Sequence, residues 1–171
     1  MLRTFRADLH IHSCLSPCGD EEMRPRAIMN QALAMGLDMI AICDHNSAEN
    51  IAAFMSAGSE KGLTVLPGME VTSKEEIHLI ALFDRREDCM ALQDLTYQNL
   101  PGENVEEVFG CQTIVNERDK TIGINRRMLI GATLLPLEQI VSTIASLGGV
   151  TIASHIDRQA FSLLGQLGFI P

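Results

Sequence analysis

Short apolar runs alternate with longer amphipathic segments along this chain of 171 residues. Strands that alternate with helices predict an α/β fold with mostly parallel strands. A polar turn at 117–120 also predicts a hairpin between 112–116 and 121–125. The predicted strands cover 5–11, 38–43, 63–66 with a continuation to 71, 77–83 and 150–154; the predicted helices cover 25–35, 48–60, 84–99, 136–147 and 158–167.

The first apolar run ends in the stretch Asp8-Leu9-His10-Ile11-His12-Ser13. Alternate side chains of a strand point to one face, so His10 and His12 are expected to be neighbours. Neighbouring buried imidazoles are costly unless their nitrogens find partners, and divalent metals commonly bind to histidine. We therefore interpret this stretch as the first part of a metal site.

The remaining histidines strengthen this interpretation. The chain has five histidines, and His10, His12, His45 and His155 lie at or just past the end of a predicted strand. Only His78 lies near a strand start, and Glu70 also ends its strand segment. Functional residues of α/β folds gather at the C-terminal ends of strands. Each histidine alone would read as a core residue, but independent structural histidines have no reason to gather there.

The composition argues against several classes of protein. Hydrophobic residues make up 46% of the chain, which excludes a disordered protein, and the net charge of -9 argues against a basic surface for long nucleic acid. No N-terminal signal core and no membrane-spanning run are present, so a cytoplasmic location without a membrane partner is expected. Five cysteines at irregular spacings indicate mostly structural thiols in a reducing compartment.

The order and spacing of these residues resemble the PHP (polymerase and histidinol phosphatase) superfamily of metal-dependent phosphoesterases. The likeness runs from residue 8 to about residue 158. The first motif is matched by Asp8–Ser13 with the acidic position at Asp20, the second by Ile42–Asn46, the third by Gly68–Val71 with His78 downstream, and the fourth by Gly148–His155.

The resemblance implies a distorted (β/α)7 barrel with two or three divalent metals at the C-terminal face of its strands. Residues 1–171 would form a single domain, the N-terminal and central part of that barrel. Glu70 falls on the carboxylate that bridges two metals, and Asp44 falls where it would orient a histidine. The metal-ligand positions are His10, His12, Asp20, His45, Glu70, His78 and His155.

One motif of the family is missing from this chain. Relatives close the site with a later Asp-x-His motif, and the sequence ends at Pro171 without it. A complete α/β barrel usually needs about 250 residues. Either the chain is a fragment, or a homo-oligomer supplies the missing strands. We expect the third metal to be weak or absent, or to be completed by exogenous groups.

The expected ligands indicate the chemistry. Mixed imidazole and carboxylate ligands suit zinc, manganese or iron better than calcium. Two such ions about 3.5–4 Å apart can activate water and offset charge on phosphoryl oxygens. We therefore expect hydrolysis of a phosphate ester. Asp44 and Arg158 are the catalytic candidates, with Arg158 binding the substrate phosphate; a surface arginine that starts a helix is the alternative.

The acidic chain favours a small phosphorylated substrate, such as a nucleotide or sugar phosphate, over long nucleic acid. Three alternatives stay open. The protein could have exonuclease-like activity on short oligonucleotide ends. It could also be a non-catalytic metal-binding or regulatory module, or a structural α/β domain whose histidines gather by coincidence.

Overall fold

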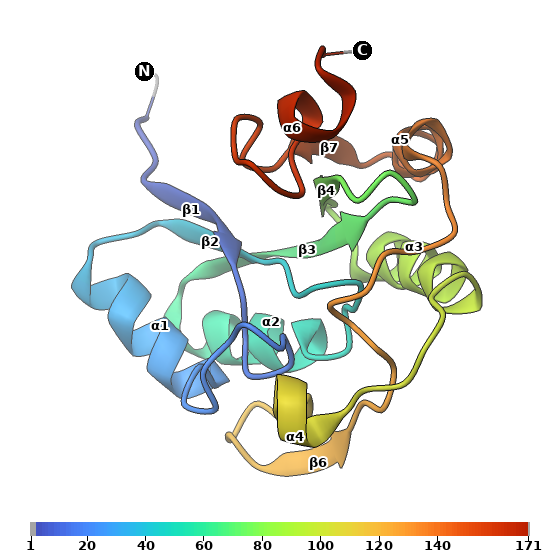
Figure 1. Cartoon of the computed structure of the whole chain (residues 1–171). Helices are drawn as coiled ribbons and strands as arrows, with labels where there is room; N and C mark the ends of the chain where they lie inside the picture. Colours follow the sequence, from blue (N-terminus) through green and yellow to red (C-terminus); the bar gives the residue numbers. More distant parts are fainter. Residues whose placement is uncertain (1–2, 171) are drawn as a thin grey trace.

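A five-stranded sheet curls through the centre of the computed structural model, which describes residues 3–170 (Figure 1). The predicted α/β class is confirmed, and the strand order is β1-β2-β3-β4-β7. The strands are β1 (Ala7–Ile11), β2 (Met39–Ile42), β3 (Thr64–Thr72), β4 (His78–Leu82) and β7 (Val150–Ala153).

Strand β4 runs against its neighbours. Strands β1, β2 and β3 pair in parallel, whereas β4 pairs antiparallel with both β3 and β7. His78, the first residue of β4, therefore pairs with Thr72, the last residue of β3. The start of β4 thus lies at the same edge of the sheet as the C-terminal ends of the other strands.

Helices cover the convex side of this sheet (Figure 1). Ile40 and Ile42 of β2 pack in one cluster with Met29 and Phe54, and Leu79 of β4 packs in another with residues of the later helices. Pro25 begins the first helix, where its missing N–H costs nothing. The helices are α1 (Pro25–Ala34), α2 (Ile51–Lys61), α3 (Arg86–Gln98) and α5 (Leu137–Ser146).

The concave side of the sheet holds a small apolar cluster built from β1, β2, β3 and β4. Alternate residues of the strands face it: Leu9, Ala41, Cys43, Leu66, Ile80 and Leu82. Gly68 allows β2 and β3 to approach closely, because a Cβ there would lie 2.6 Å from Sγ of Cys43. A larger residue at this position would push the strands apart below the site.

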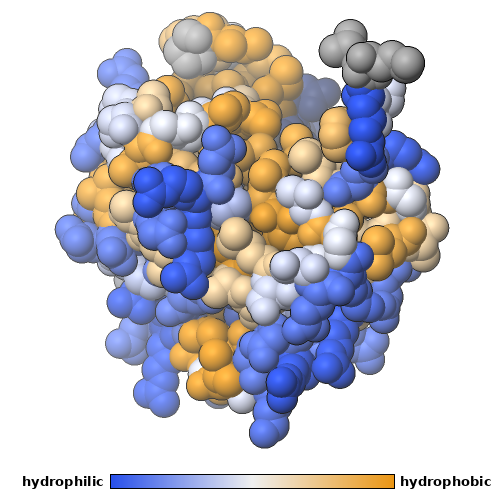
Figure 2. Space-filling view, turned by 180° about the vertical axis from the view of Figure 1, so that it is seen from behind, coloured by the Kyte–Doolittle hydropathy of each residue, from blue (hydrophilic) through white to orange (hydrophobic). Residues whose placement is uncertain are grey.

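The sheet is an incomplete barrel, because its edge strands β1 and β7 do not pair with each other within residues 3–170. A cavity of about 430 Å³ lies between these edges, lined by Asp8, His10, Ile152 and His155 among others. Exposed apolar residues lie nearby, including Val150 and Ile152 of β7. Viewed from behind, hydrophobic surface extends between the segment that leads into β1 and the segment that follows β7 (Figure 2).

The remaining elements lie around this half barrel. The predicted hairpin is confirmed as β5 (Thr113–Val115) and β6 (Thr121–Ile124), and α4 (Glu106–Phe109) is a short helix that was not predicted. Helix α6 (Leu163–Leu167) starts later than predicted, because Ser162 caps it by accepting a hydrogen bond from the N–H of Gly165. None of the helices in the described part of the chain is long and apolar enough to cross a membrane.

Candidate metal centre

Glu70 lies at the centre of the candidate site. Its side chain is 1% exposed, and all five histidines of the chain surround its carboxylate. The imidazole nitrogens nearest to the two carboxylate oxygens are His45 Nδ1 at 3.1 Å, His12 Nε2 and His78 Nδ1 at 3.2 Å, His10 Nε2 at 3.4 Å and His155 Nε2 at 3.6 Å. The predicted gathering of histidines at one edge of the sheet is therefore observed.

The strand ends deliver these side chains to one place. His10 and His12 come from the end of β1, where the pairing with β2 is irregular between Asp8 and Ile11, and their Nε2 atoms lie 3.0 Å apart. His45 follows β2 and forms an isolated parallel bridge with Glu70 of β3. His78 arrives from the start of β4, which is antiparallel, and His155 follows β7 with a positive φ of 28°. A non-glycine residue with this backbone conformation often marks a functional site.

Several buried polar atoms of the site have no hydrogen-bond partner among residues 3–170. They are Glu70 Oε1, His45 Nδ1, His155 Nδ1 and both ring nitrogens of His78. Buried polar atoms are usually paired, because an unpaired one carries the full cost of desolvation. Imidazole and carboxylate are ligands of zinc, manganese and iron. The residues present therefore fit a divalent metal ion.

The separations between these side chains also fit shared coordination. Two nitrogen or oxygen ligands on one tetrahedral zinc ion, with bonds of about 2.0–2.1 Å, lie about 3.3 Å apart. The distances from Glu70 to its four nearest imidazoles range from 3.1 to 3.4 Å. Three groups of residues each bring their ligand atoms within 4.8 Å of one another. The groups are His10, His12 and Glu70; His45, Glu70 and His78; and His12, Cys18 and His45.

The electrostatics of the site follow from its crowding. Burial alone would raise the pKa of Glu70, but the surrounding imidazoles of His10, His12 and His78 hold that pKa far below its usual range. Burial lowers the pKa of His45 to about 3. Burial would also lower the pKa of His12, yet its contacts with Cys18 and Glu70 raise it to about 10. An ionised carboxylate beside a neutral His45 is the state required for binding a cation.

Asp44 supports the site without touching an imidazole. It is buried, and its carboxylate accepts hydrogen bonds from the N–H and hydroxyl of Ser13 and from the hydroxyl of Ser16. The oxygen of Ser16 lies 2.9 Å from Nδ1 of His12 and accepts a bond from the N–H of His45. Ser16 thus links Asp44 to the ring of His12 and to the backbone of His45, and the orienting role of Asp44 stays a prediction.

Asp20 and Arg158 are not among the residues whose side chains gather around Glu70. Asp20 is exposed, its carboxylate accepts a hydrogen bond from the N–H of Glu22, and it is in none of the three ligand groups found among the described residues. Arg158 is exposed in the turn after His155, where its N–H donates to the carbonyl of His155. A ligand role for Asp20 and a phosphate-binding role for Arg158 stay predictions.

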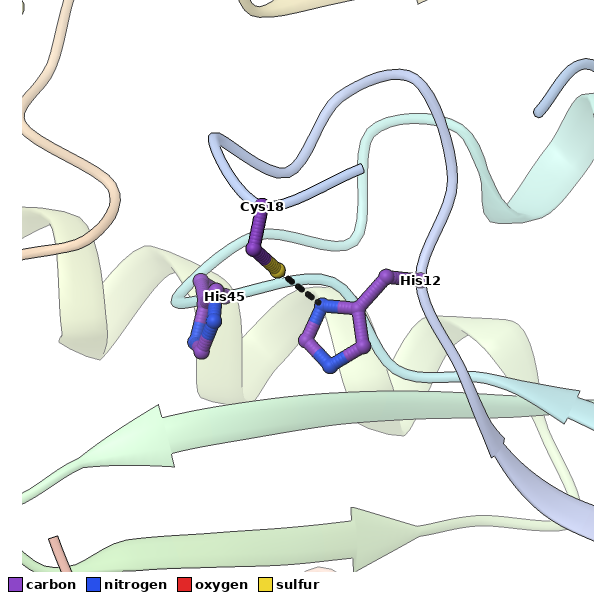
Figure 3. A group of neighbouring side chains, drawn as sticks. All are labelled: His12, Cys18 and His45. Atoms are coloured by element: carbon purple, nitrogen blue, oxygen red, sulfur yellow. Dashed lines mark hydrogen bonds between the residues drawn. The ribbon is translucent and has the colours of Figure 1, made fainter. Parts of the chain in front are cut away.

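Sequence reasoning missed two side chains of the site. Cys18, from the loop after β1, points its sulfur at the ring of His12, with His45 beside it (Figure 3). Phe161 stacks on His78 with ring centroids 4.7 Å apart and an interplanar angle of 22°. The proximity of Cys18 to the first histidine motif was the one available signal for it, and no local pattern marks Phe161.

A second cavity opens on the other side of β1. It has a volume of about 460 Å³ and is lined by His10, His12 and Cys18 together with apolar residues of α1, such as Ile28 and Ala32. This volume falls in the range usual for small-molecule sites. The imidazoles of β1 thus lie between two cavities, each wide enough for a small ligand.

Comparison with known proteins places these features in a family. A family model described as PHP domain matches residues 8–127. A metal-dependent phosphoesterase, so assigned, from Bifidobacterium adolescentis has a similar fold, with a TM-score of 0.60 and 20% identity over 92% of this chain and 69% of that protein. The fold observed for this chain is therefore similar to that of a solved structure.

Two curated relatives share part of the sequence. A 5'-3' exoribonuclease of Haemophilus influenzae is 33% identical over 86 residues, which are 48% of this chain and 30% of that protein. A phosphoribosyl 1,2-cyclic phosphate 1,2-diphosphodiesterase of Eggerthella lenta is 23% identical over 146 residues, or 81% of this chain and 54% of that protein. This chain therefore spans only about a third to a half of these relatives.

Proposed function

Because this chain belongs to the PHP domain family, we propose that it is a metal-dependent hydrolase that cleaves a phosphate ester of a small molecule or nucleotide. The observation that carries the proposal is the convergence of five imidazoles on the single buried carboxylate of Glu70. A structural core would leave no such set of unpaired nitrogens.

The residues would have different roles in such a site. His10, His12, His45, His78, His155 and Glu70 would hold the ions, and Asp44 would keep the loop of Ser13 and Ser16 in place. Ions of this kind lower the pKa of water and offset the charge that develops on phosphoryl oxygens. Arg158 would bind a phosphate oxygen of the substrate. None of these roles requires a covalent nucleophile from the protein.

The cavities and the charge support a small substrate. The two cavities beside His10 measure about 460 and 430 Å³, which suits a molecule the size of a nucleotide or sugar phosphate. The net charge of -9 disfavours long nucleic acid, because phosphate backbones bind chiefly to basic surfaces. The cyclic phosphodiesterase of Eggerthella lenta acts, by its name, on a small phosphate ester.

The test is a screen of purified protein, stripped of metal and reloaded separately with zinc, manganese or iron. The substrates are nucleoside monophosphates, sugar phosphates, a cyclic phosphodiester and a chromogenic phosphodiester. Hydrolysis that depends on the added metal and disappears in Glu70→Gln supports the proposal. Equal rates in the wild type and Glu70→Gln would overturn it, since that activity would not come from this centre.

An exonuclease-like activity on short oligonucleotide ends is the second candidate. It is favoured by the 33% identity to the exoribonuclease of Haemophilus influenzae. Short oligonucleotides labelled at either end would be degraded stepwise from one end and would compete with the small esters. A non-catalytic metal-binding module would instead bind metal and hydrolyse none of these substrates under any metal.

A further inference from the structure

The loop after β1 turns back sharply and returns Cys18 to the cluster of histidines. The N–H of Ser16 donates to the carbonyl of Ser13, and the N–H of Gly19 donates to the carbonyl of Ser16. A Cβ at position 19 would lie only 2.1 Å from the carbonyl oxygen of Ser13, so the turn requires glycine there. The position of Cys18 is thus fixed by tight backbone packing.

The sulfur of Cys18 lies where a metal ligand would lie. Its Sγ atom is 3.5 Å from Nδ1 of His12, and ligand atoms of Cys18, His12 and His45 all lie within 4.8 Å of one another (Figure 3). A sulfur ligand and a nitrogen ligand on one tetrahedral zinc ion, with bonds of about 2.3 and 2.0–2.1 Å, lie about 3.5 Å apart. The observed separation matches this value.

His45 supplies a second indication of a ligand beside Cys18. The residue is 5% exposed, and its Nδ1 atom, which lies 3.1 Å from Oε2 of Glu70, has no hydrogen-bond partner in the described part of the chain. By contrast, the carboxylate of Asp20 is exposed and bonds to the backbone of Glu22. The loop therefore presents a thiol to the centre and turns the expected acidic ligand away from it.

We propose that the Cys18 thiolate is a metal ligand of this centre and shares its ion with His12 and His45, in the place expected for Asp20. This inference rests on the proposed metal site. A thiolate is a softer ligand than a carboxylate and favours zinc over manganese. The competing interpretation is that Cys18 and Ser16 only form hydrogen bonds to Nδ1 of His12.

Cobalt(II) distinguishes these interpretations, because cobalt bound to a thiolate absorbs strongly in the near ultraviolet. Metal-stripped protein without a histidine tag is titrated with cobalt, and bound cobalt is counted by elemental analysis of the same samples. The variants are Cys18→Ser, Asp20→Asn and Cys111→Ser. Cys111 is the matched control, a cysteine that hydrogen-bonds to Glu106 outside the three ligand groups. Circular dichroism checks that every variant folds.

The proposal predicts a sulfur-to-cobalt band in the wild type, in Asp20→Asn and in Cys111→Ser, and its loss in Cys18→Ser. Cobalt uptake without the band in the wild type, or a band that persists in Cys18→Ser, overturns the role of Cys18 but leaves the metal site intact. No cobalt uptake by the wild type overturns both the ligand role and the proposed function.

Metal preference gives a second readout. Cys18→Ser should weaken zinc binding at least about tenfold, which is the smallest loss usual even for a residue that only supports a metal ligand, and should weaken manganese binding less. Cys18→Asp should shift preference towards manganese, because it replaces sulfur with oxygen. Equal losses for zinc and manganese in Cys18→Ser would contradict a thiolate ligand.

Discussion

His45 and Glu70 are joined both by their side chains and by their backbones. Nδ1 of His45 lies 3.1 Å from Oε2 of Glu70, and the two residues form a parallel bridge between β3 and the segment after β2. The N–H of Glu70 donates to the carbonyl of Asp44, and the N–H of Asn46 donates to the carbonyl of Glu70. The central carboxylate is therefore held in place before any ligand arrives.

Replacement of the Glu70 carboxylate tests whether it holds the metal ions. Glu70→Gln should remove most of the bound metal and lower metal-dependent hydrolysis at least about 100-fold, because the amide lacks the charge that holds the ions. Elemental analysis and initial rates measure the two effects. Glu60→Gln, an exposed glutamate at the end of α2, is the control. Full metal content in Glu70→Gln would show that the ions do not depend on this carboxylate.

Asp44 should act by positioning. Asp44→Ala leaves three buried donors of Ser13 and Ser16 without their acceptor, which should lower the free energy of unfolding by at least about 2 kcal/mol. It should also weaken metal binding about 10–100-fold. Asp44→Asn should recover part of both losses, because its amide oxygen can still accept the N–H of Ser13. Urea denaturation and metal competition measure these effects.

The exposed Asp94 on α3 provides the control, and Asp94→Ala should change neither quantity. If metal binding is equally strong in Asp44→Ala and Asp94→Ala, Asp44 has no part in orienting the histidines.

The stability of the metal-stripped protein should fall with acidity. Burial lowers the pKa of His45 from 6.5 to about 3. Between pH 6.5 and 5, the unfolded chain takes up a proton at this position that the folded chain does not bind. The free energy of unfolding therefore falls as the pH falls, by up to about 1.4 kcal/mol per pH unit for one proton. Urea denaturation at several pH values should show that the free energy of unfolding depends less steeply on pH in His45→Gln than in the wild type. Identical slopes would refute the lowered pKa of His45.

Arg158 is predicted to bind the substrate phosphate. Arg158→Ala should raise KM several-fold and leave the metal content unchanged, because Arg158 is exposed and belongs to none of the ligand groups found in residues 3–170. Arg126, which is also exposed and follows the β5–β6 hairpin, serves as the control. Kinetic constants for Arg158→Ala that match the wild type would remove this residue from the site.

The pattern of the sequence predicted most elements, but not the direction of β4. An apolar run such as 77–83 looks the same whether its strand is parallel or antiparallel. His78 seemed out of place at a strand start for this reason. Its pairing with Thr72 shows that the start of β4 meets the ends of the other strands. The direction depends on pairing across the sheet, which local residue patterns do not encode.

The metal centre, like the fold, was predicted only in part from the sequence. His10, His12, His45, His155 and Glu70 were identified because strand ends place their side chains at one edge of the sheet, whereas His78 was identified only by the family resemblance. Cys18 was read as a structural thiol, since loop conformation decides whether Cys18 or Asp20 faces the histidines. That decision rests on the close contact between Gly19 and the carbonyl of Ser13. A contact between backbone atoms of this kind becomes visible only in three dimensions.

The metal content per chain tests the central claim most directly. The measurement is elemental analysis of protein purified without chelator and without a histidine tag, repeated after incubation with zinc, manganese or iron. The convergence of imidazoles on Glu70 predicts about two equivalents of metal per chain, in line with the two-metal sites of phosphoesterases. A content near zero, with no uptake from added metal, would contradict the metal centre and the hydrolase function that depends on it.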